Sequence, residues 1–188
     1  RERMFSHGSH LYRRLDEGVA AYNIDDGSEE WRYTTPDGHG HQLYSNGSVI
    51  AYRNGYIDKI DASDGTADWT ELITNCSFPG GVHIASNGEY VAATNVCNDD
   101  TKNQIVVLDF ETGNEVWRKS FYEIPIEKGA ASYWIMISDG LLYAIVSEGG
   151  FHGDEVAVFD LASGEELGRV NIQSLIPLNM AQVEGLVF

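Results

Sequence analysis

The stretch LDFETGNEVW, Leu108–Trp117, occurs in four related copies, and this repetition decides the fold. Each copy has an Asp or Asn four residues before a glycine, and the first three copies have a tryptophan four residues after it. The aligned positions are Asn23, Gly27 and Trp31; Asp61, Gly65 and Trp69; Asp109, Gly113 and Trp117; Asp160, Gly164 and Gly168. The glycines lie 38 to 51 residues apart, which indicates a repeated structural unit of that length.

A second turn precedes each glycine motif and divides the repeat into short strands. Its Asn-Gly and Asp-Gly pairs favour the left-handed turns of two-residue β-hairpins. These turns are Ser6–Gly8, Ser45–Gly47, Ser86–Gly88, Ser138–Gly140 and, near the end of the chain, Glu184–Gly185. Apolar, β-prone runs such as SVIAYR and LLYAIVS follow them, and helix signals are nearly absent. Each repeat is therefore expected to form four antiparallel strands, named A to D in chain order, which is the blade of a β-propeller.

The glycine motif has a mechanical interpretation. The glycine is expected to take a positive φ at the turn between strands C and D. The Asp or Asn side chain caps that turn. The tryptophan then falls on strand D, where its ring can pack against the next blade. Because the ring recurs at one position of each repeat, this structural role is favoured over ligand binding.

The four copies resemble the repeat of the pyrroloquinoline-quinone (PQQ)-like, quinoprotein-type propellers. In that family a D-x-x-T/S-G-x-x-x-W stretch closes each blade. Asp109, Thr112, Gly113 and Trp117 match it fully, the second copy has Asp64 at the Thr/Ser position, and the fourth copy has no tryptophan. The resemblance implies an all-β fold: a β-propeller of four-stranded antiparallel blades with tryptophan-docking repeats, as part of a seven- or eight-bladed ring.

The repeats divide the chain into parts of a single propeller domain. The expected blades cover residues 1–35, 36–75, 76–122 and 123–172, and residues 173–188 begin a further blade. Because the sequence opens inside a strand A and ends in an incomplete blade, we expect the rest of the ring to lie outside this segment.

The charge of the chain excludes one class of partner. Its net charge is −17, from 29 acidic and 12 basic residues, and such a surface repels phosphate backbones. We therefore expect no nucleic-acid binding. An acidic, lysine-poor surface also suits a high-salt environment, in which screening removes the self-repulsion. No apolar run approaches the roughly 18 residues that a membrane-spanning helix needs.

The two cysteines, Cys76 and Cys97, leave two interpretations open. They form no C-x-x-C motif, which excludes zinc-ribbon, redox and c-type haem sites. One interpretation is a pair of buried thiols. The other, which we favour because both cysteines follow strand-like runs, is a disulfide between neighbouring repeats and an oxidising compartment.

Candidate ligand-binding residues lie in the connections from strand D to the next strand A. In such propellers strand A lines the axis, so these connections carry His39, His41, His83, Tyr133 and Trp134 toward it. They are the candidate cofactor-binding residues. His39-x-His41 places both imidazoles on one face of an extended strand, a spacing that can chelate a transition metal. The competing interpretation is two solvent-exposed histidines in a glycine-rich loop.

The remaining motifs in the sequence give weaker indications of function. Asp99, Asp100, Asp154 and Glu155 lack the spacing of an EF-hand loop and are expected at solvated hairpin tips. Two N-x-S/T patterns fit N-glycosylation, although the first, at Asn46, is also explained by its turn. No catalytic residue is assigned.

The resemblance implies two classes of function. Some family members are alcohol or sugar dehydrogenases that hold PQQ with Ca²⁺, and others are non-catalytic assembly or cell-surface binding propellers. The adjacent Cys-Cys pair of the methanol-dehydrogenase type and a C-x-x-C-H haem motif are absent from this sequence. We therefore expect a non-catalytic, extracytoplasmic scaffold (periplasmic, cell-surface or secreted) with a protein or glycan partner on one face. The alternatives are a fragment of a PQQ- and Ca²⁺-dependent dehydrogenase and a self-assembling cell-surface protein that pairs through an exposed edge strand.

Overall fold

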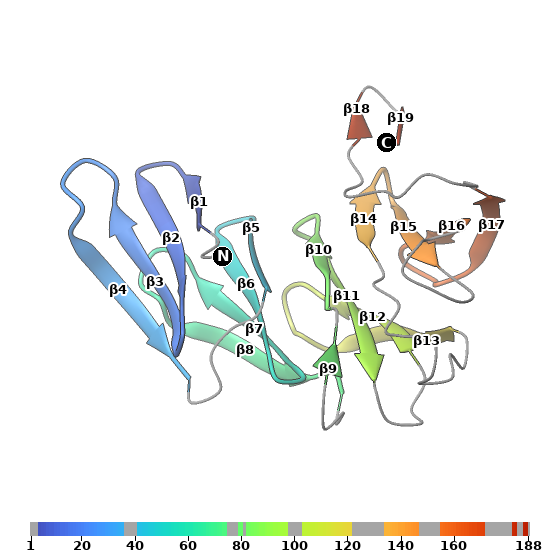
Figure 1. Ribbon diagram of the computed structural model, residues 1–188, viewed down its shortest axis with the longest axis horizontal. Coiled ribbons are helices and arrows are strands. Elements are labelled where there is room, and N and C mark those ends of the chain that lie inside the picture. Colours follow the sequence, from blue (N-terminus) through green and yellow to red (C-terminus); the bar gives the residue numbers. More distant parts are fainter. Residues whose placement is uncertain are drawn as a thin grey trace. The chain divides into compact units, whose positions relative to one another are not determined.

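The computed structural model describes residues 4–35, 41–74, 79–80, 82–97, 103–121, 134–146, 155–171, 182–183 and 186–187. The chain divides into two compact units, Arg1–Ile73 and Thr74–Phe188. Each unit contains two sheets in which four antiparallel strands are adjacent in the order of the chain, and the second unit also contains a two-stranded sheet (Figure 1). The predicted all-β fold of four-stranded antiparallel blades is confirmed.

The first unit consists of blades 1 and 2. Blade 1 comprises β1 (Met4–His7), β2 (His10–Leu15), β3 (Gly18–Asn23) and β4 (Glu29–Thr34). Blade 2 comprises β5 (His41–Ser45), β6 (Ser48–Arg53), β7 (Tyr56–Asp61) and β8 (Ala67–Leu72). In both blades the four strands correspond in order to the predicted strands A to D.

The second unit contains blades 3 and 4 and three short strands. Blade 3 comprises β10 (Ile84–Ser86), β11 (Tyr90–Cys97), β12 (Asn103–Asp109) and β13 (Glu115–Phe121). Blade 4 comprises β14 (Ile135–Ser138), β15 (Leu141–Val146), β16 (Glu155–Asp160) and β17 (Glu166–Asn171). The short strands are β9 (Pro79–Gly80), which pairs with β11, and β18 (Gln182–Val183) and β19 (Leu186–Val187), which pair with each other.

Strand β9 departs from the prediction of four strands per repeat. It lies within the connection expected to lead from strand D to strand A. The long strand β11 extends past the start of β10, so the backbone of Pro79 and Gly80 pairs with its free end, at Cys97 and Val96. The sheet of blade 3 therefore has a fifth, two-residue strand.

The repeated glycines adopt the left-handed conformation that the sequence predicts. Their φ values are 73° at Gly27, 76° at Gly65, 73° at Gly113 and 72° at Gly164. In each turn the glycine N–H donates to the carbonyl of the Asp or Asn four residues earlier, at 2.9 Å. The side-chain oxygen of the same Asp or Asn accepts a backbone N–H two or three residues further on. The turn is thus closed by both the backbone and the capping side chain.

A hydroxyl also caps each turn, and its position explains the departure at Asp64. In blade 3 the Thr112 hydroxyl, one residue before the glycine, donates to Asp109 at 2.7 Å. In blade 2 the direction is reversed. Asp64 precedes the glycine and accepts from the hydroxyl of Thr66, which follows it, also at 2.7 Å. The two residue orders build the same turn.

Each blade has a β-bulge in its outermost strand, three residues after the glycine. In blade 1, Ala21 pairs with Trp31 and Tyr22 pairs with Glu29, which leaves Glu30 as the extra residue. The extra residues of the other blades are Asp68, Val116 and Leu167. In a regular strand, residues two positions apart lie on the same face of the sheet. The extra residue shifts this alternation, so the tryptophan lies on the opposite face from the glutamate or alanine two positions before it.

Ion pairs span the bulge on the face of the outer strand that is opposite the tryptophan position. In three blades a glutamate two residues after the glycine forms an ion pair with an arginine three residues further on. The pairs are Glu29–Arg32, Glu115–Arg118 and Glu166–Arg169. This Glu-x-x-Arg pattern could have been found by extending the sequence repeat past the tryptophan.

The tryptophans of blades 1 and 3 each pack on the glycine turn of the following blade. A Cβ added to Gly65 would lie 2.6 Å from the Trp31 ring, and one added to Gly164 would lie 2.7 Å from the Trp117 ring. The Trp31 Nε1–H donates to the carbonyl of Ala62 at 3.0 Å, and the Trp117 Nε1–H donates to that of Leu161 at 2.8 Å. These two glycines therefore supply both a left-handed turn and a seat for an indole ring.

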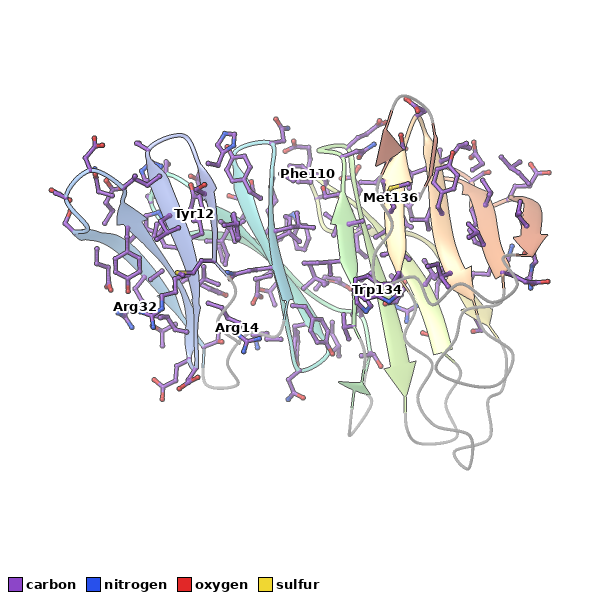
Figure 2. The ribbon with its side chains drawn as sticks, turned by 45° about the horizontal axis from the view of Figure 1, so that its top comes forward. Tyr12, Arg14, Arg32, Phe110, Trp134 and Met136 are labelled. Carbon is purple, nitrogen blue, oxygen red and sulfur yellow. The ribbon has the colours of Figure 1, made fainter. Side chains whose placement is uncertain are left out.

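The core of each unit lies between its two blades. The core of the first unit contains Tyr12 (Figure 2), Val19, Ala21, Trp31, Val49, Ala51, Ile60 and Ala62. That of the second unit contains Ala92, Ile105, Val107, Leu142, Ala144, Ala157, Phe159 and Leu161. We call these two contacts the first seam and the second seam. The main hydrophobic stabilisation of each unit is thus interblade packing.

A matched pair of glycine substitutions separates the two requirements of the turn. Gly65→Ala is expected to lower the free energy of unfolding by about 2–5 kcal/mol, the sum of left-handed strain and overpacking against Trp31. Gly27→Ala is expected to cost only the strain, about 1–2 kcal/mol, because a Cβ there meets nothing within 4 Å. Urea denaturation of both variants gives the two free energies of unfolding. An equal decrease in both variants would contradict the inference that Gly65 makes room for the Trp31 ring.

Candidate functional site

The starts of the inner strands hold the predicted axial residues that the structure describes. His83 precedes β10 and Trp134 precedes β14. The Thr94 N–H donates to the His83 carbonyl and the Ile145 N–H to the Trp134 carbonyl, both at 2.9 Å. His41 begins β5 opposite Tyr52, which is the same position in the register of blade 2. Three of the five predicted residues therefore occupy equivalent positions in their own blades.

The second unit brings His83 and Trp134 into contact. The centroids of the imidazole and indole rings are 4.2 Å apart, and their planes make an angle of 34°. The buried hydroxyl of Thr94 accepts a hydrogen bond from the His83 N–H at 2.9 Å, which fixes the backbone that carries the imidazole. Figure 2 places Trp134 at the beginning of β14, with Met136 further along that strand. Two residues 51 positions apart in the sequence thus form one half-buried aromatic pair.

The remaining predicted site residues lie outside what the structure describes. These are His39, Tyr133 and Cys76, together with the side chains of His41 and Cys97. The metal hypothesis and the disulfide therefore stay predictions. Among the described side chains, no three His, Cys, Asp or Glu residues are placed to share a metal ion.

A second histidine–aromatic pair, not singled out from the sequence, joins the inner strands of the first unit. His7, the last residue of β1, stacks on Tyr44 of β5 with centroids 3.8 Å apart and planes at 18°. This pair lies where the inner strands end, whereas His83 and Trp134 lie where they begin. Each unit thus has an imidazole in ring contact across its two inner strands, at the end of the strands in the first unit and at their start in the second. His7 belongs to the predicted turn Ser6–Gly8, but a position in a turn does not predict a ring contact with Tyr44, so no sequence signal pointed to the pair.

The first seam contains a buried ion pair. Asp58 is fully buried, and its Oδ2 lies 2.8 Å from Nε of Arg53, whose side chain is 14% exposed. The Thr70 hydroxyl donates to the other carboxylate oxygen at 2.7 Å. The Arg53 guanidinium also lies 4.7 Å from the centroid of the Tyr56 ring. Both carboxylate oxygens are therefore satisfied within blade 2.

Tyr33 connects this ion pair to blade 1. Its hydroxyl makes hydrogen bonds with Thr70 and Arg53. Burial raises the pKa of Tyr33, and the nearby Asp58 carboxylate raises it further. The phenol therefore stays protonated through the neutral range and bridges the two blades as a neutral group. The network gives the seam directional contacts in addition to its apolar packing.

The second seam uses a lysine where the first uses a tyrosine. Lys119 lies two residues after its tryptophan, as Tyr33 does. Its Nζ is 3.4 Å from the carbonyl of Gly164, 3.9 Å from a carboxylate oxygen of Glu166 and 5.0 Å from the centroid of the Phe159 ring. The Lys119 side chain is 36% exposed, so this contact is partly solvated and contributes less than a buried pair.

Carboxyl groups in three of the repeated turns have a lowered pKa. In each case the largest cause is a hydrogen bond from a serine hydroxyl, followed by one from the backbone N–H of the same serine. The groups are Asp26 with Ser28, Asp61 with Ser63, and Asp160 with Ser163. A lowered pKa in the folded state means that these ionised caps favour folding above the unfolded-state value, near 3.9.

Acid is therefore expected to weaken the turns. As the pH falls below the unfolded-state value, about 3.9, the contribution of the ionised caps to the free energy of unfolding decreases, and it is lost once the pH has passed the lowered pKa of the caps. Asn23 occupies the same position in blade 1, so asparagine is compatible with the turn. A chain with Asp61→Asn and Asp160→Asn is expected to show a smaller acid-dependent fall in the urea midpoint than the wild type. If the urea midpoint falls equally with pH in both proteins, the ionised caps do not contribute to the stability of the fold.

Comparison with known proteins identifies the fold. The described residues contain no helix of the length and hydrophobicity that a membrane span requires. The chain is similar to BamB from Moraxella catarrhalis, with 19% identity and a TM-score of 0.61 over 87% of this chain and 50% of that one. It is also similar to a quinohemoprotein alcohol dehydrogenase from Pseudomonas putida HK5, with 16% identity and a TM-score of 0.67 over 98% of this chain and 37% of that one.

A third similar structure is Sqt1 of Saccharomyces cerevisiae, with 14% identity and a TM-score of 0.71 over 96% of this chain and 51% of that one. The chain thus spans about half the length of BamB and of Sqt1, and less of the dehydrogenase. Comparison with curated protein sequences gave no match. The family model described as outer membrane protein assembly factor BamB matches residues 2–182. The chain therefore belongs to the BamB-type family of PQQ-like β-propellers.

Proposed function

We propose that this chain is part of a non-catalytic, extracytoplasmic propeller that acts as a binding or assembly scaffold for a protein partner. The name of the matching family, an outer membrane protein assembly factor, supports both the assembly role and the location. The partner binds at the end of the blades where the inner strands begin.

The observation that carries this proposal is the His83–Trp134 pair. The Trp117 ring is used to join blades 3 and 4. The His83–Trp134 pair lies apart from that seat, at the start of the inner strands, and both side chains remain half-buried. Tryptophan is enriched among the residues that dominate protein–protein binding, because it buries a large rigid surface at low entropic cost. The pair is suited to anchor one side chain of a partner.

The charge of the chain indicates the chemistry of that partner. With a net charge of −17, the surface attracts basic proteins and speeds their association at low ionic strength. An arginine side chain fits the pair well, because its guanidinium can stack on an indole. We therefore expect the contact surface of the partner to be basic, and its binding to weaken as salt is added.

The test compares two single substitutions. Trp134→Ala removes the anchor, and Val170→Ala removes an exposed apolar side chain of β17, 59% exposed, as a matched control. Each purified chain is immobilised and used to capture extracytoplasmic proteins of the source cells, and captured proteins are quantified by mass spectrometry. A basic protein retained by the wild type and by Val170→Ala, but reduced roughly thirtyfold with Trp134→Ala, is expected. Equal capture by all three would contradict the proposal, as would capture of glycans alone.

A PQQ- and Ca²⁺-dependent dehydrogenase is the second candidate, favoured by the structural likeness to the alcohol dehydrogenase. Calcium requires several carboxylate or amide oxygens around one point. Among the described side chains, no three His, Cys, Asp or Glu residues converge on one point, so these side chains do not fit the ion. A spectroscopic titration with PQQ and Ca²⁺ distinguishes the two functions. We expect no uptake, and stoichiometric uptake would support the dehydrogenase instead.

A further inference from the structure

The sequence contains three Asn-Gly pairs: Asn46-Gly47, Asn54-Gly55 and Asn87-Gly88. Such pairs can deamidate without an enzyme. The glycine amide nitrogen attacks the asparagine side-chain carbon, ammonia leaves, and a five-membered imide forms. Water then opens the imide to aspartate or isoaspartate. The net change is hydrolysis of an amide with release of ammonia, and no oxidant or cofactor takes part.

Two of the pairs have the same backbone conformation. Asn46 and Gly47 have φ values of 43° and 80°, and Asn54 and Gly55 have values of 35° and 92°. Both form two-residue left-handed turns, the first between β5 and β6 and the second between β6 and β7. Any restriction that the turn places on the attack of the glycine nitrogen therefore applies to both. Differences in their reactivity must come from the contacts of each pair.

The glycine nitrogen is hydrogen-bonded at Asn54-Gly55 but not at Asn46-Gly47. The Gly55 N–H donates to the hydroxyl of the buried Tyr52 at 3.0 Å, and Gly55 itself is buried. At the other turn both residues are exposed. In the part of the chain that the structure describes, neither the Gly47 N–H nor the Asn46 side chain makes a hydrogen bond. The nitrogen of Gly47 is thus available for attack, and that of Gly55 must first leave its partner.

At the third pair, Asn87-Gly88, both the asparagine side chain and the glycine N–H make hydrogen bonds. The side-chain oxygen of Asn87 accepts hydrogen bonds from the N–H groups of Glu89 and Tyr90, at 3.0 and 2.9 Å. The Gly88 N–H donates to the Ser86 hydroxyl at 3.2 Å. Both the attacked group and the attacking nitrogen are therefore restrained.

We propose that Asn46 is a site of spontaneous deamidation, and that Asn54 and Asn87 are protected by these hydrogen bonds. Deamidation at Asn46 also affects the packing of blades 1 and 2 at the first seam. The Gly47 carbonyl accepts the Ala62 N–H at 3.0 Å, and the Ala62 carbonyl accepts the Trp31 indole N–H at 3.0 Å. Isoaspartate lengthens the main chain between residues 46 and 47, which displaces the Gly47 carbonyl. The product therefore loosens the turn on which Trp31 is seated.

The experiment follows all three sites in one sample. The folded chain is incubated at mildly alkaline pH and digested, and each Asn-Gly peptide is quantified by its mass increase of about 1 Da. Asn46 is expected to react roughly two- to tenfold faster than Asn54 and Asn87, the factor that corresponds to one net hydrogen bond. Equal rates at the three sites, or a faster rate at Asn54 or Asn87, would overturn the proposal.

A second variant tests the cause of the protection. Tyr52→Phe keeps the ring and removes the hydroxyl that holds the Gly55 N–H. The rate at Asn54 is expected to rise roughly two- to tenfold, while the rate at Asn46 stays unchanged and shows that the fold is intact. An unchanged rate at Asn54 would overturn the assignment. The isolated isoaspartate form should also unfold at a lower urea concentration than an Asn46→Asp variant, which carries the same charge without the longer backbone.

Discussion

Replacement of Asp58 by alanine is expected to lower the free energy of unfolding by about 3–5 kcal/mol. The side chain is fully buried, and its removal leaves the largely buried Arg53 guanidinium without its partner. The Thr70 hydroxyl also loses its acceptor. Since Tyr33 joins the same network from blade 1, the loss should appear as weaker contact between blades 1 and 2. Urea denaturation gives the free energy, and protease resistance of the first unit reports the seam.

Two further variants separate the charge from the packing. Asp58→Asn keeps an acceptor for Thr70 and should cost less than alanine, because part of the hydrogen bonding remains. Replacing the pair together, with Arg53→Met and Asp58→Leu, removes both charges and is expected to be far less damaging than Asp58→Ala alone. If the double replacement is as destabilising as the single one, the ion pair is not the source of the effect.

Replacement of Trp31 by alanine is expected to lower the free energy of unfolding by about 3–5 kcal/mol. The ring is 7% exposed and fills the space above Gly65, so its loss creates a cavity at the centre of the first seam. Trp31→Phe retains much of the ring and loses the hydrogen bond to Ala62, so a smaller decrease is expected. The measurement is again the urea midpoint with its slope.

The second seam supplies the control for this prediction. Trp117 makes the equivalent contact with Gly164 and Leu161, but its ring is only partly buried. Trp117→Ala should therefore be destabilising to a smaller extent than Trp31→Ala. A loss below about 0.5 kcal/mol at both positions would show that the contacts of the indole rings with the glycine turns do not hold the blades together, since that is the scale of a surface substitution.

The fold could be predicted because its signals are local and repeated. The turn between strands C and D requires a positive φ, which favours glycine at that position, and the capping Asp or Asn lies four residues away in the same turn. The destination of Trp31 and Trp117 could also be predicted, because a large ring that recurs on the outer strand must be buried against something. These inferences need only the period of the repeat and the chemistry of short segments.

Much of the candidate site depends on contacts between blades, which spacing does not encode. The sequence marked His83 and Trp134 as neighbours of the axis, but only the structure shows that their rings are in contact. The pair His7–Tyr44 and the burial of Asp58 have no local signature at all. The bulge was missed for a different reason: it changes which residues share a face without changing any spacing along the chain.

The bulge bears on the behaviour of this protein at high concentration. The outermost strand of a blade has a free side on which another chain could add a strand and begin an aggregate. Here the outer strand of each of the four blades is bent at an extra residue, and in blades 1, 3 and 4 a glutamate–arginine pair spans the bend. A strand arriving in regular register would lose hydrogen bonds at the bend and meet fixed charges. The same irregularity that aims the tryptophan at the next blade thus protects the outer edge from amyloid-like growth.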